Sequence, residues 1–156
     1  MPPSRQPPDT GSIPTLLRGA RATYAAAIGA ALREAGFADV PRDGAFVLGA
    51  IAHGGTPMSE IITRLRISKQ AAGQLVDTLV RRGYLVRSPD PDDRRRLTVR
   101  LTERGDAAAA VGLAARHHVD AALVAEVGTE TVARLREALR ALARSDLLIR
   151  EGTGAP

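Results

Sequence analysis

The sequence contains no cysteine, no tryptophan and only four aromatic residues, two Phe and two Tyr. Without cysteine the chain cannot form disulfides, thiolate metal sites or cysteine redox switches. Its apolar residues are mostly Ala, Leu, Val and Ile, so close helix packing is favoured over an aromatic-rich pocket. No stretch approaches the roughly 18 uncharged apolar residues of a membrane span, and the first residues lack the apolar run of a signal peptide. We therefore expect a soluble cytoplasmic protein, and its 156 residues suit one compact or small bilobed domain.

The first third of the chain predicts two helices after a disordered tail. Residues 1–12 are rich in Pro, Ser and Gly, which is typical of disorder. From Ile13 onward apolar residues recur at helical spacing until Gly36, which provides a stop signal. A second helix is predicted from Pro41 to about Ala52. The small residues along the first helix fit either ordinary core packing or a subunit interface.

The middle of the chain predicts a pair of short helices followed by a β-hairpin, with a short edge strand before them at 56–58. Ser59 and Ser68 are the expected N-caps of the two helices, and Gly83 is expected just past the end of the second. A turn rich in Pro and Asp joins the hairpin strands. The expected elements are helices at 60–65 and 69–82 and strands at 84–87 and 97–101.

The C-terminal third predicts two further helices. Thr102 is expected to cap a long Ala-rich helix that runs to about Val127, with interruptions at Gly105 and Gly112. A last helix follows 128–129, and its apolar stripe consists of Val132, Leu135, Leu139 and Leu142. The predicted fold class is therefore mainly α with a small β-hairpin.

The net charge of the chain is concentrated in the helix pair and hairpin. Residues 58–105 hold eleven basic and six acidic side chains, a balance of +5. The rest of the chain holds eleven of each. The segment that carries the whole formal charge thus also has the layout of a helix-turn-helix with a basic loop, which favours nucleic acid as the partner.

The predicted helix 69–82 has one apolar and one polar face. On a helical wheel the apolar face consists of Ala72, Leu75, Val76, Leu79 and Val80. The opposite face consists of Lys69, Gln70, Gly73, Gln74 and Asp77. Gln can form a bidentate pair with adenine, and Lys can donate to guanine or phosphate. The alternative is an ordinary surface helix with a solvated face.

The hairpin tip carries three arginines, Arg94, Arg95 and Arg96, directly after an acidic stretch that ends at Asp93. We expect one guanidinium to enter a minor groove, where narrow A·T tracts attract arginine. Another would pair with Asp93 and hold the loop. The alternative is a salt-bridged turn without a partner, but this does not explain why the basic run follows a capped helix pair at the spacing of a wing.

The run ISKQAAGQLVDTLVRRGYLVRSPDPDDRRRLTVRLTERG resembles the recognition helix and wing of MarR-type (multiple antibiotic resistance regulator) winged helix-turn-helix transcriptional regulators. The family's Asp-x-Arg signature is Asp93-Arg94-Arg95 in this chain, and the resemblance extends over about residues 13–146. It implies a homodimer built by the first and last two helices. It also implies recognition helices in successive major grooves of a pseudo-palindrome, with the wings on flanking minor grooves.

By position, the resemblance implies that residues of the recognition helix and of the wing contact DNA. The groove contacts are Ser68, Lys69, Gln70, Gly73 and Gln74. At the wing Arg95 is the expected tip residue, and Arg94 and Arg96 contact phosphates or support the loop beside Asp93. The implied domain division is a tail at 1–12, a dimerisation helix at 13–40, a winged helix-turn-helix domain at 41–101, dimerisation helices at 102–148 and a tail at 149–156.

Many proteins of this family release DNA when a small, often aromatic, ligand binds between the dimerisation helices and the reading domain. The residues expected near such a ligand are Tyr24, Phe46, His53 and His117. His117 and His118 are adjacent on a helix and about 100° apart, so they cannot easily share one metal ion. We therefore expect no metal and no cofactor.

The sequence contains no nucleophile elbow, phosphate loop or paired-carboxylate signature, so we do not expect an enzyme. The prediction is a homodimeric, sequence-specific transcriptional regulator of double-stranded DNA, and more narrowly a ligand-responsive repressor of a pseudo-palindromic operator. One alternative is a winged-helix module that binds an acidic protein partner. Another is an architectural protein that binds DNA without sequence preference.

Overall fold

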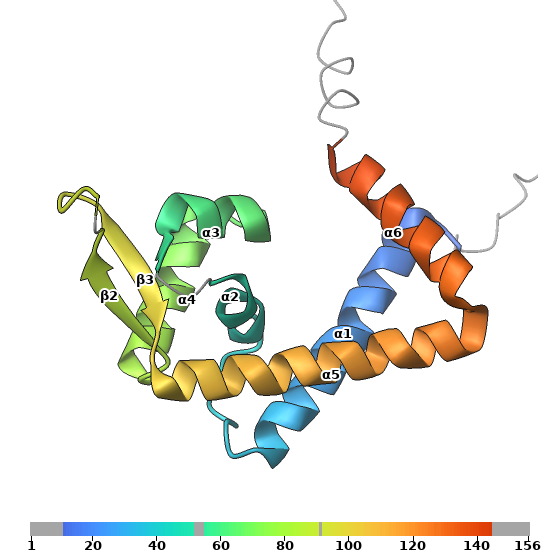
Figure 1. The fold of residues 1–156 in the computed structure, drawn as a ribbon, viewed down its shortest axis with the longest axis horizontal. Helices are drawn as coiled ribbons and strands as arrows, with labels where there is room; N and C mark the ends of the chain where they lie inside the picture. The colour runs from blue at the N-terminus through green and yellow to red at the C-terminus, as the bar shows by residue number, and fades with distance from the viewer. Residues whose placement is uncertain (1–10, 52–54, 91, 145–156) are drawn as a thin grey trace, which may run out of the picture. The chain divides into compact units, whose positions relative to one another are not determined.

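The computed structural model describes residues 11–51, 55–90 and 92–144 of the chain, and Figure 1 shows their fold. The elements, in chain order, are α1 (Ile13–Glu34), α2 (Gly44–Ala50), β1 (Thr56–Pro57), α3 (Met58–Leu65), α4 (Lys69–Arg81), β2 (Leu85–Pro89), β3 (Leu97–Leu101), α5 (Glu103–Val127) and α6 (Thr129–Arg144). The three strands form one antiparallel sheet in the order β1-β3-β2. The predicted class, mainly α with a small β-hairpin, is confirmed. The chain divides into two compact units, residues 1–117 and 118–156.

The core of the first unit lies where α1, α2, α3, α4 and the sheet meet. Its fully buried side chains come mostly from α2, α3, α4 and the sheet, and the largest are Tyr84, Leu48, Ile61, Leu79, Val47, Val76 and Val99. Ile28 and Leu32 bring the C-terminal half of α1 into the same cluster. By contrast, Ile13 and Leu16 in the first turns of α1 are 64% and 58% exposed. The apolar face of α1 is thus only partly used within one chain.

The two strands of the hairpin pair in a continuous register. β2 and β3 pair from Leu85 opposite Leu101 to Pro89 opposite Leu97. The short strand β1 adds to the other edge of β3, with Thr56 opposite Val99. The predicted edge strand is therefore confirmed, although its third residue, Met58, begins α3 instead.

Several helix ends lie where local chemistry predicts. Ser68 accepts a hydrogen bond from the amide of Ala71 at 3.1 Å and begins α4. At the other end Gly83 has φ 75°, and the amides of Gly83 and Tyr84 bond back to the carbonyls of Val80 and Leu79. This Schellman arrangement satisfies the last carbonyls of the helix. It also explains why β2 begins at Leu85 and not, as predicted, at residue 84.

Three further local predictions differ from the structure. α2 begins at Gly44, because Pro41 opens a turn in which its carbonyl accepts the Gly44 amide at 2.7 Å. Ser59 does not cap α3, since the helix already begins at Met58 and Pro57 occupies the cap position. Ser12, expected in the disordered tail, caps α1 by accepting from the amide of Thr15. The remainder of both predicted tails lies almost entirely outside the described residues.

α5 runs without a break from Glu103 to Val127, so the two predicted interruptions do not occur. Gly105 and Gly112 are both buried on the helix, the first against Tyr84 and the second next to Ile28. A Cβ on Gly105 would lie 2.0 Å from the carbonyl oxygen of Tyr84. Both glycines are therefore contact points of an intact helix.

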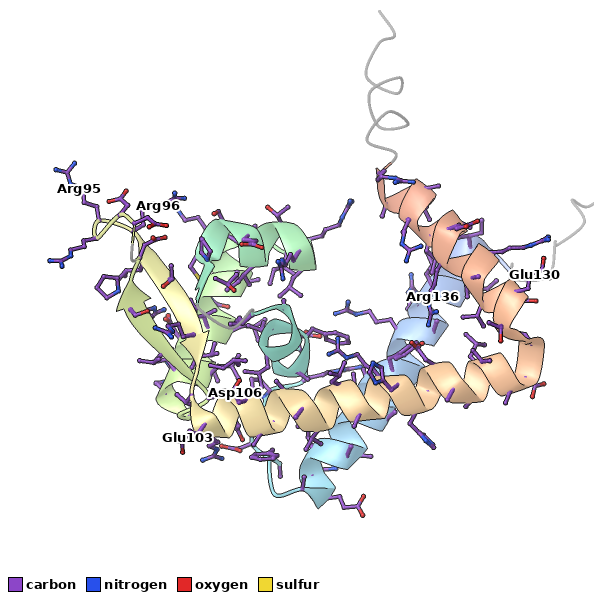
Figure 2. The ribbon with its side chains drawn as sticks, in the orientation of Figure 1. Arg95, Arg96, Glu103, Asp106, Glu130 and Arg136 are labelled. Atoms are coloured by element: carbon purple, nitrogen blue, oxygen red, sulfur yellow. The ribbon has the colours of Figure 1, made fainter. Side chains whose placement is uncertain are left out.

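The second unit contains the end of α5 and all of α6. Gly128, with φ 86°, reverses the chain between the two helices. Arg136 on α6 pairs with Asp120 on α5 at 2.9 Å, and Figure 2 labels Arg136. Of the predicted apolar stripe only Val132 is buried, whereas Leu135, Leu139 and Leu142 are 37–49% exposed. A second apolar surface is thus left open on α6.

Candidate nucleic-acid interface

The predicted recognition helix α4 has one buried and one open face. Ala72, Val76 and Leu79 are completely buried, and Leu75 and Val80 pack against the same core. On the opposite side Lys69, Gln70 and Gln74 are exposed, and Gly73 is half-buried. A Cβ on Gly73 would meet nothing within 4 Å, so the backbone there is open to a large partner. The structure thus brings the predicted groove contacts together on one accessible surface.

Ser68 differs from its neighbours, because its side-chain oxygen is already used to cap the helix. The exposed hydroxyl can still donate a hydrogen bond to a phosphate while it accepts one from the Ala71 amide. The helix N-terminus around it also favours negative charge. Phosphate contact is therefore the chemistry that this residue suits best.

Asp77, predicted on the open face, forms an ion pair with Arg87 instead. The arginine projects from β2, so the pair connects the recognition helix to the first strand of the wing. Asp77 is half-buried and Arg87 exposed. We conclude that this ion pair helps to fix the position of the wing relative to α4. It could not be predicted from spacing, because a helix end and a turn lie between the two partners.

The wing loop is shaped by carboxylates that accept hydrogen bonds from backbone amides. Asp90 Oδ1 accepts from the amides of Asp92 at 2.9 Å and Asp93 at 3.4 Å. Asp93 Oδ1 accepts from the amide of Arg95 at 3.0 Å. Two further bonds, from the Asp90 amide to the Arg96 carbonyl and from the Arg96 amide to the Asp93 carbonyl, close the loop. These bonds give the tip a defined shape.

The expected ion pair between a wing arginine and Asp93 is absent from the described residues, where Asp93 Oδ1 instead accepts the backbone amide of Arg95. In this part of the chain, none of Arg94, Arg95 and Arg96 pairs with an acid. All three are exposed, and Figure 2 shows Arg95 and Arg96 at the tip of the hairpin. The tip therefore presents three guanidinium groups whose charge is not compensated by contact.

A polar cluster that the sequence did not predict joins the start of α5 to the rest of the first unit. The Tyr84 hydroxyl donates to Asp39 Oδ1 at 2.5 Å. Arg104 donates to both oxygens of Asp39 at 2.9 and 3.1 Å, and its guanidinium lies 4.5 Å above the ring of Tyr84. The hydrogen bond from Tyr84, helped by Arg104, holds the pKa of Asp39 below its usual value. Burial, with the nearby carboxylate, raises the pKa of Tyr84.

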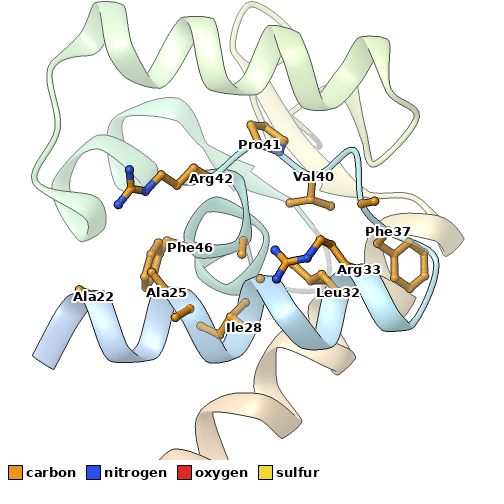
Figure 3. A pocket seen from close by; sticks show the side chains of 14 residues that line it. Ala22, Ala25, Ile28, Leu32, Arg33, Phe37, Val40, Pro41, Arg42 and Phe46 are labelled. Atoms are coloured by element: carbon orange, nitrogen blue, oxygen red, sulfur yellow. The ribbon is translucent and has the colours of Figure 1, made fainter.

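The residues expected near a small ligand are not all brought together. Tyr24 packs against the hydrophobic core, His117 is exposed on α5, and His53 lies outside the described residues. Phe46 does line a cavity of about 390 Å³, which we call the α1 cavity. α1 forms one wall of it and residues 37–46 form the other (Figure 3).

The α1 cavity is largely apolar but contains two arginines, Arg33 and Arg42. Arg33 lies back along α1, so that its Nη1 would be 3.3 Å from a Cβ on Gly29. Within the described ranges neither guanidinium has an acidic partner. Figure 3 shows one rising from α1 and the other from the segment before α2. An apolar cavity of this size with two unpaired cations suits a ligand that carries negative charge.

The described residues offer neither a metal centre nor a membrane segment. No three His, Cys, Asp or Glu side chains in this part of the chain come together in a way that could hold a metal ion. None of the described helices is both long enough and apolar enough to cross a membrane.

Comparison with known proteins shows the fold and a family match in the middle of the chain. A model described as "MarR family" matches residues 38–96, from the cluster at Asp39 to the wing tip. No curated protein matches the sequence. A probable transcriptional regulator from Pseudomonas aeruginosa is similar at 28% identity and a TM-score of 0.67, over 85% of this chain and 97% of that one.

Two further solved structures are similar along most of their length. CouR from Rhodococcus jostii, bound to p-coumaroyl-CoA, shares 25% identity with a TM-score of 0.68, over 87% of this chain and 94% of that one. FabT from Streptococcus pneumoniae, in complex with DNA, has a TM-score of 0.68 over 83% and 92%, and its 18% identity shows the fold alone. The family match over residues 38–96 coincides with the recognition helix and the wing. This part of the chain is thus similar to the MarR family of winged helix-turn-helix transcriptional regulators.

Proposed function

We propose that this protein is a homodimeric regulator that binds a specific pseudo-palindromic operator and represses transcription until a small ligand releases it. The DNA-binding part of this proposal rests on the three arginines at the wing tip. Within the residues that the structure describes, all three are exposed and none pairs with an acid. They belong to the same positively charged segment as the open face of α4. In this proposal Lys69, Gln70, Gly73 and Gln74 contact the major groove, Ser68 contacts a phosphate at its edge, and Arg94, Arg95 and Arg96 contact the minor groove or phosphates.

Exposed apolar residues on the terminal helices support the dimer. In the first unit these are Ile13, Leu16 and Leu17 on α1, and in the second they are Leu135, Leu139 and Leu142 on α6. Apolar surface of this kind is unusual on a monomer and marks an interaction site. In this proposal residues 13–40 and 102–148 build the dimer, and residues 41–101 read the DNA. Two-fold symmetry would place the two half-sites about 34 Å apart.

The α1 cavity is the proposed effector site. Its two guanidiniums, from Arg33 and Arg42, would attract the anionic end of a ligand, and its alanine-rich walls would accept an apolar body. CouR, which has the same fold, is bound to a ligand that combines an aromatic group with an anionic one, p-coumaroyl-CoA. We therefore propose a small aromatic anion as the effector of this protein.

Selection of bound duplexes from a random pool by the purified protein tests the DNA-binding proposal. We expect a palindromic motif and, because several phosphates are neutralised, a steep fall of affinity with salt. Equal competition by random DNA would instead indicate an architectural protein. No binding even at low salt would favour a winged-helix module for protein partners. Sedimentation of the free protein measures whether it is a dimer.

Titration with p-coumarate and with its uncharged amide tests the effector class. We expect the carboxylate to bind, the amide to bind much more weakly, and the Arg33→Gln, Arg42→Gln double variant to lose the difference between them. Equal binding of both compounds to the native protein would contradict an anion-selective cavity. Release of the selected operator by the carboxylate would link the cavity to regulation.

A further inference from the structure

The ring of Phe46 lies between two cavities of the first unit. One is the α1 cavity. The other, about 300 Å³, we call the recognition-helix cavity, and it is lined by Arg21, Asp43, Phe46, Arg64, Leu65, Ile67, Ala71 and Leu75. Phe46 is the one described residue that lines both of them. The two spaces thus share a single side-chain wall.

The far wall of the recognition-helix cavity belongs to the element proposed to read DNA. Ala71 and Leu75 are in the first two turns of α4, next in sequence to Gln70 and Gln74 of its open face. Phe46 itself is in α2, which packs against both α3 and α4. A displacement of the ring toward this cavity would therefore bring it closer to Ala71 and Leu75 of the helix that carries the proposed base-contacting surface.

The ring is held by groups that permit such a displacement. Phe46 is only half-buried. The Arg21 guanidinium lies 4.6 Å from the ring centroid, and the same arginine pairs with Asp43 at 3.3 Å. A cation–π contact of an exposed arginine is worth about 0.5–1 kcal/mol, so it orients the ring without locking it. Empty volume on both sides leaves the ring two directions in which to move.

We propose that Phe46 is a positioning residue that transmits occupancy of the α1 cavity to the recognition helix. A group that fills the α1 cavity displaces the ring toward Leu75, shifts the start of α4 and lowers operator affinity. The proposal rests on the DNA-binding function proposed above. A ligand regulates DNA binding only if it favours the arrangement with low operator affinity over the one with high operator affinity. The Phe46 wall shared by the two cavities would provide this coupling by direct contact.

The test fills the α1 cavity from within the protein, so it needs no identified ligand. Ala25 lines this cavity, as Phe46 does, and both are labelled in Figure 3. We expect Ala25→Leu to weaken binding to the selected operator at least about fivefold, the lower range of allosteric coupling. In a Phe46→Ala background the same substitution should change affinity less than about twofold, because a double-mutant cycle isolates the coupling between the two sites.

The control is Ala30→Leu, at an exposed position of the same helix that lines neither cavity. Because residues 13–40 are proposed to build the dimer, this control is interpreted only where sedimentation shows an intact dimer, and operator affinity should then be unchanged. Ala22→Leu, which also fills the α1 cavity, replaces Ala25→Leu if that variant does not fold, and Phe46→Leu similarly replaces Phe46→Ala. Thermal unfolding and sedimentation of every variant accompany the anisotropy titrations.

Three outcomes would overturn the inference: unchanged affinity in Ala25→Leu, an equal loss with and without the Phe46 ring, or loss of affinity only through dissociation of the dimer. Failure of the native protein to select any duplex would be a different result. It would contradict the DNA-binding proposal itself before the variants are measured.

Discussion

Replacement of Gly105 by alanine should destabilise the first unit, because this glycine leaves room for a backbone carbonyl group. An added Cβ would lie 2.0 Å from the carbonyl oxygen of Tyr84 and 3.2 Å from Cδ2 of Leu101. The same carbonyl accepts the amide of Thr102 at 3.1 Å. The Thr102 hydroxyl in turn accepts the amide of Gly105 at 3.0 Å. The clash would thus occur where α5 is joined to the strand–helix core.

The energetic cost follows from these contacts. Cβ atoms essentially never approach another heavy atom within 3.0 Å, so α5 or the Tyr84 backbone must move by about 1 Å. Overpacking typically costs about 1–3 kcal/mol, and the upper part of that range applies because a carbonyl group cannot rotate away as a side chain does. The better helix propensity of alanine returns about 1 kcal/mol. We expect a net loss of about 2 kcal/mol in the free energy of unfolding.

Urea unfolding followed by far-ultraviolet circular dichroism measures this loss as a lower midpoint with an unchanged slope. Gly112→Ala on the same helix is the matched control. Its Cβ would meet only Cγ2 of Ile28 at 3.6 Å, an ordinary contact. This variant should be as stable as the native protein or more stable by up to about 1 kcal/mol. If Gly105→Ala unfolds at the native midpoint or above it, the close approach to Tyr84 is not a constraint and the reasoning fails.

Arg95→Ala should weaken operator binding by about 1–3 kcal/mol and reduce the salt slope by about one, and an unchanged affinity in a gel-shift titration would exclude Arg95 from the contact. Asp77→Asn breaks the pair with Arg87, so operator affinity should fall because the wing is no longer held against α4, and a rise in affinity would show instead that the acid acts only through its charge. Tyr84→Phe should lower the free energy of unfolding at neutral pH. The pKa of Asp39 is depressed in the folded protein, so the part of this stability difference that depends on the Asp39 charge should disappear as the pH falls below about 3.8. A stability difference that persists unchanged at lower pH would show that the Tyr84 hydroxyl does not act through the charge of Asp39.

Those features of the fold that depend on neighbouring residues could be predicted from the sequence. Ser68, Gly83 and Thr102 each act within a few positions of themselves, and the structure shows each in its predicted cap role. The buried and open faces of α4 are likewise predictable, because they follow from helical spacing alone. Spacing and two caps are therefore sufficient to locate the recognition helix and its proposed contact residues.

The errors arose where a residue has two local roles and distant contacts choose between them. Pro41 is as suitable for a turn as for the first position of a helix, and in the structure its carbonyl accepts the Gly44 amide in a turn. Gly105 and Gly112 would interrupt a helix if only their propensity counted. Their actual role depends on Tyr84 and Ile28, which come from other parts of the chain. Spacing cannot show such contacts.

The arrangement of the candidate site could be predicted less fully than its residues, and the wing shows the reason. Three acids directly before three arginines suggest ion pairs, but Asp90 and Asp93 use their oxygens to hold backbone amides of the loop. A carboxylate oxygen used in this way stabilises a tight turn, and in the described residues neither acid pairs with a guanidinium group. The arginines then keep their donors available for phosphate oxygens, which accept them in strong, charge-assisted bonds. The acids of the wing therefore support the proposed function by shaping the loop, and their proximity to the arginines does not argue against DNA binding.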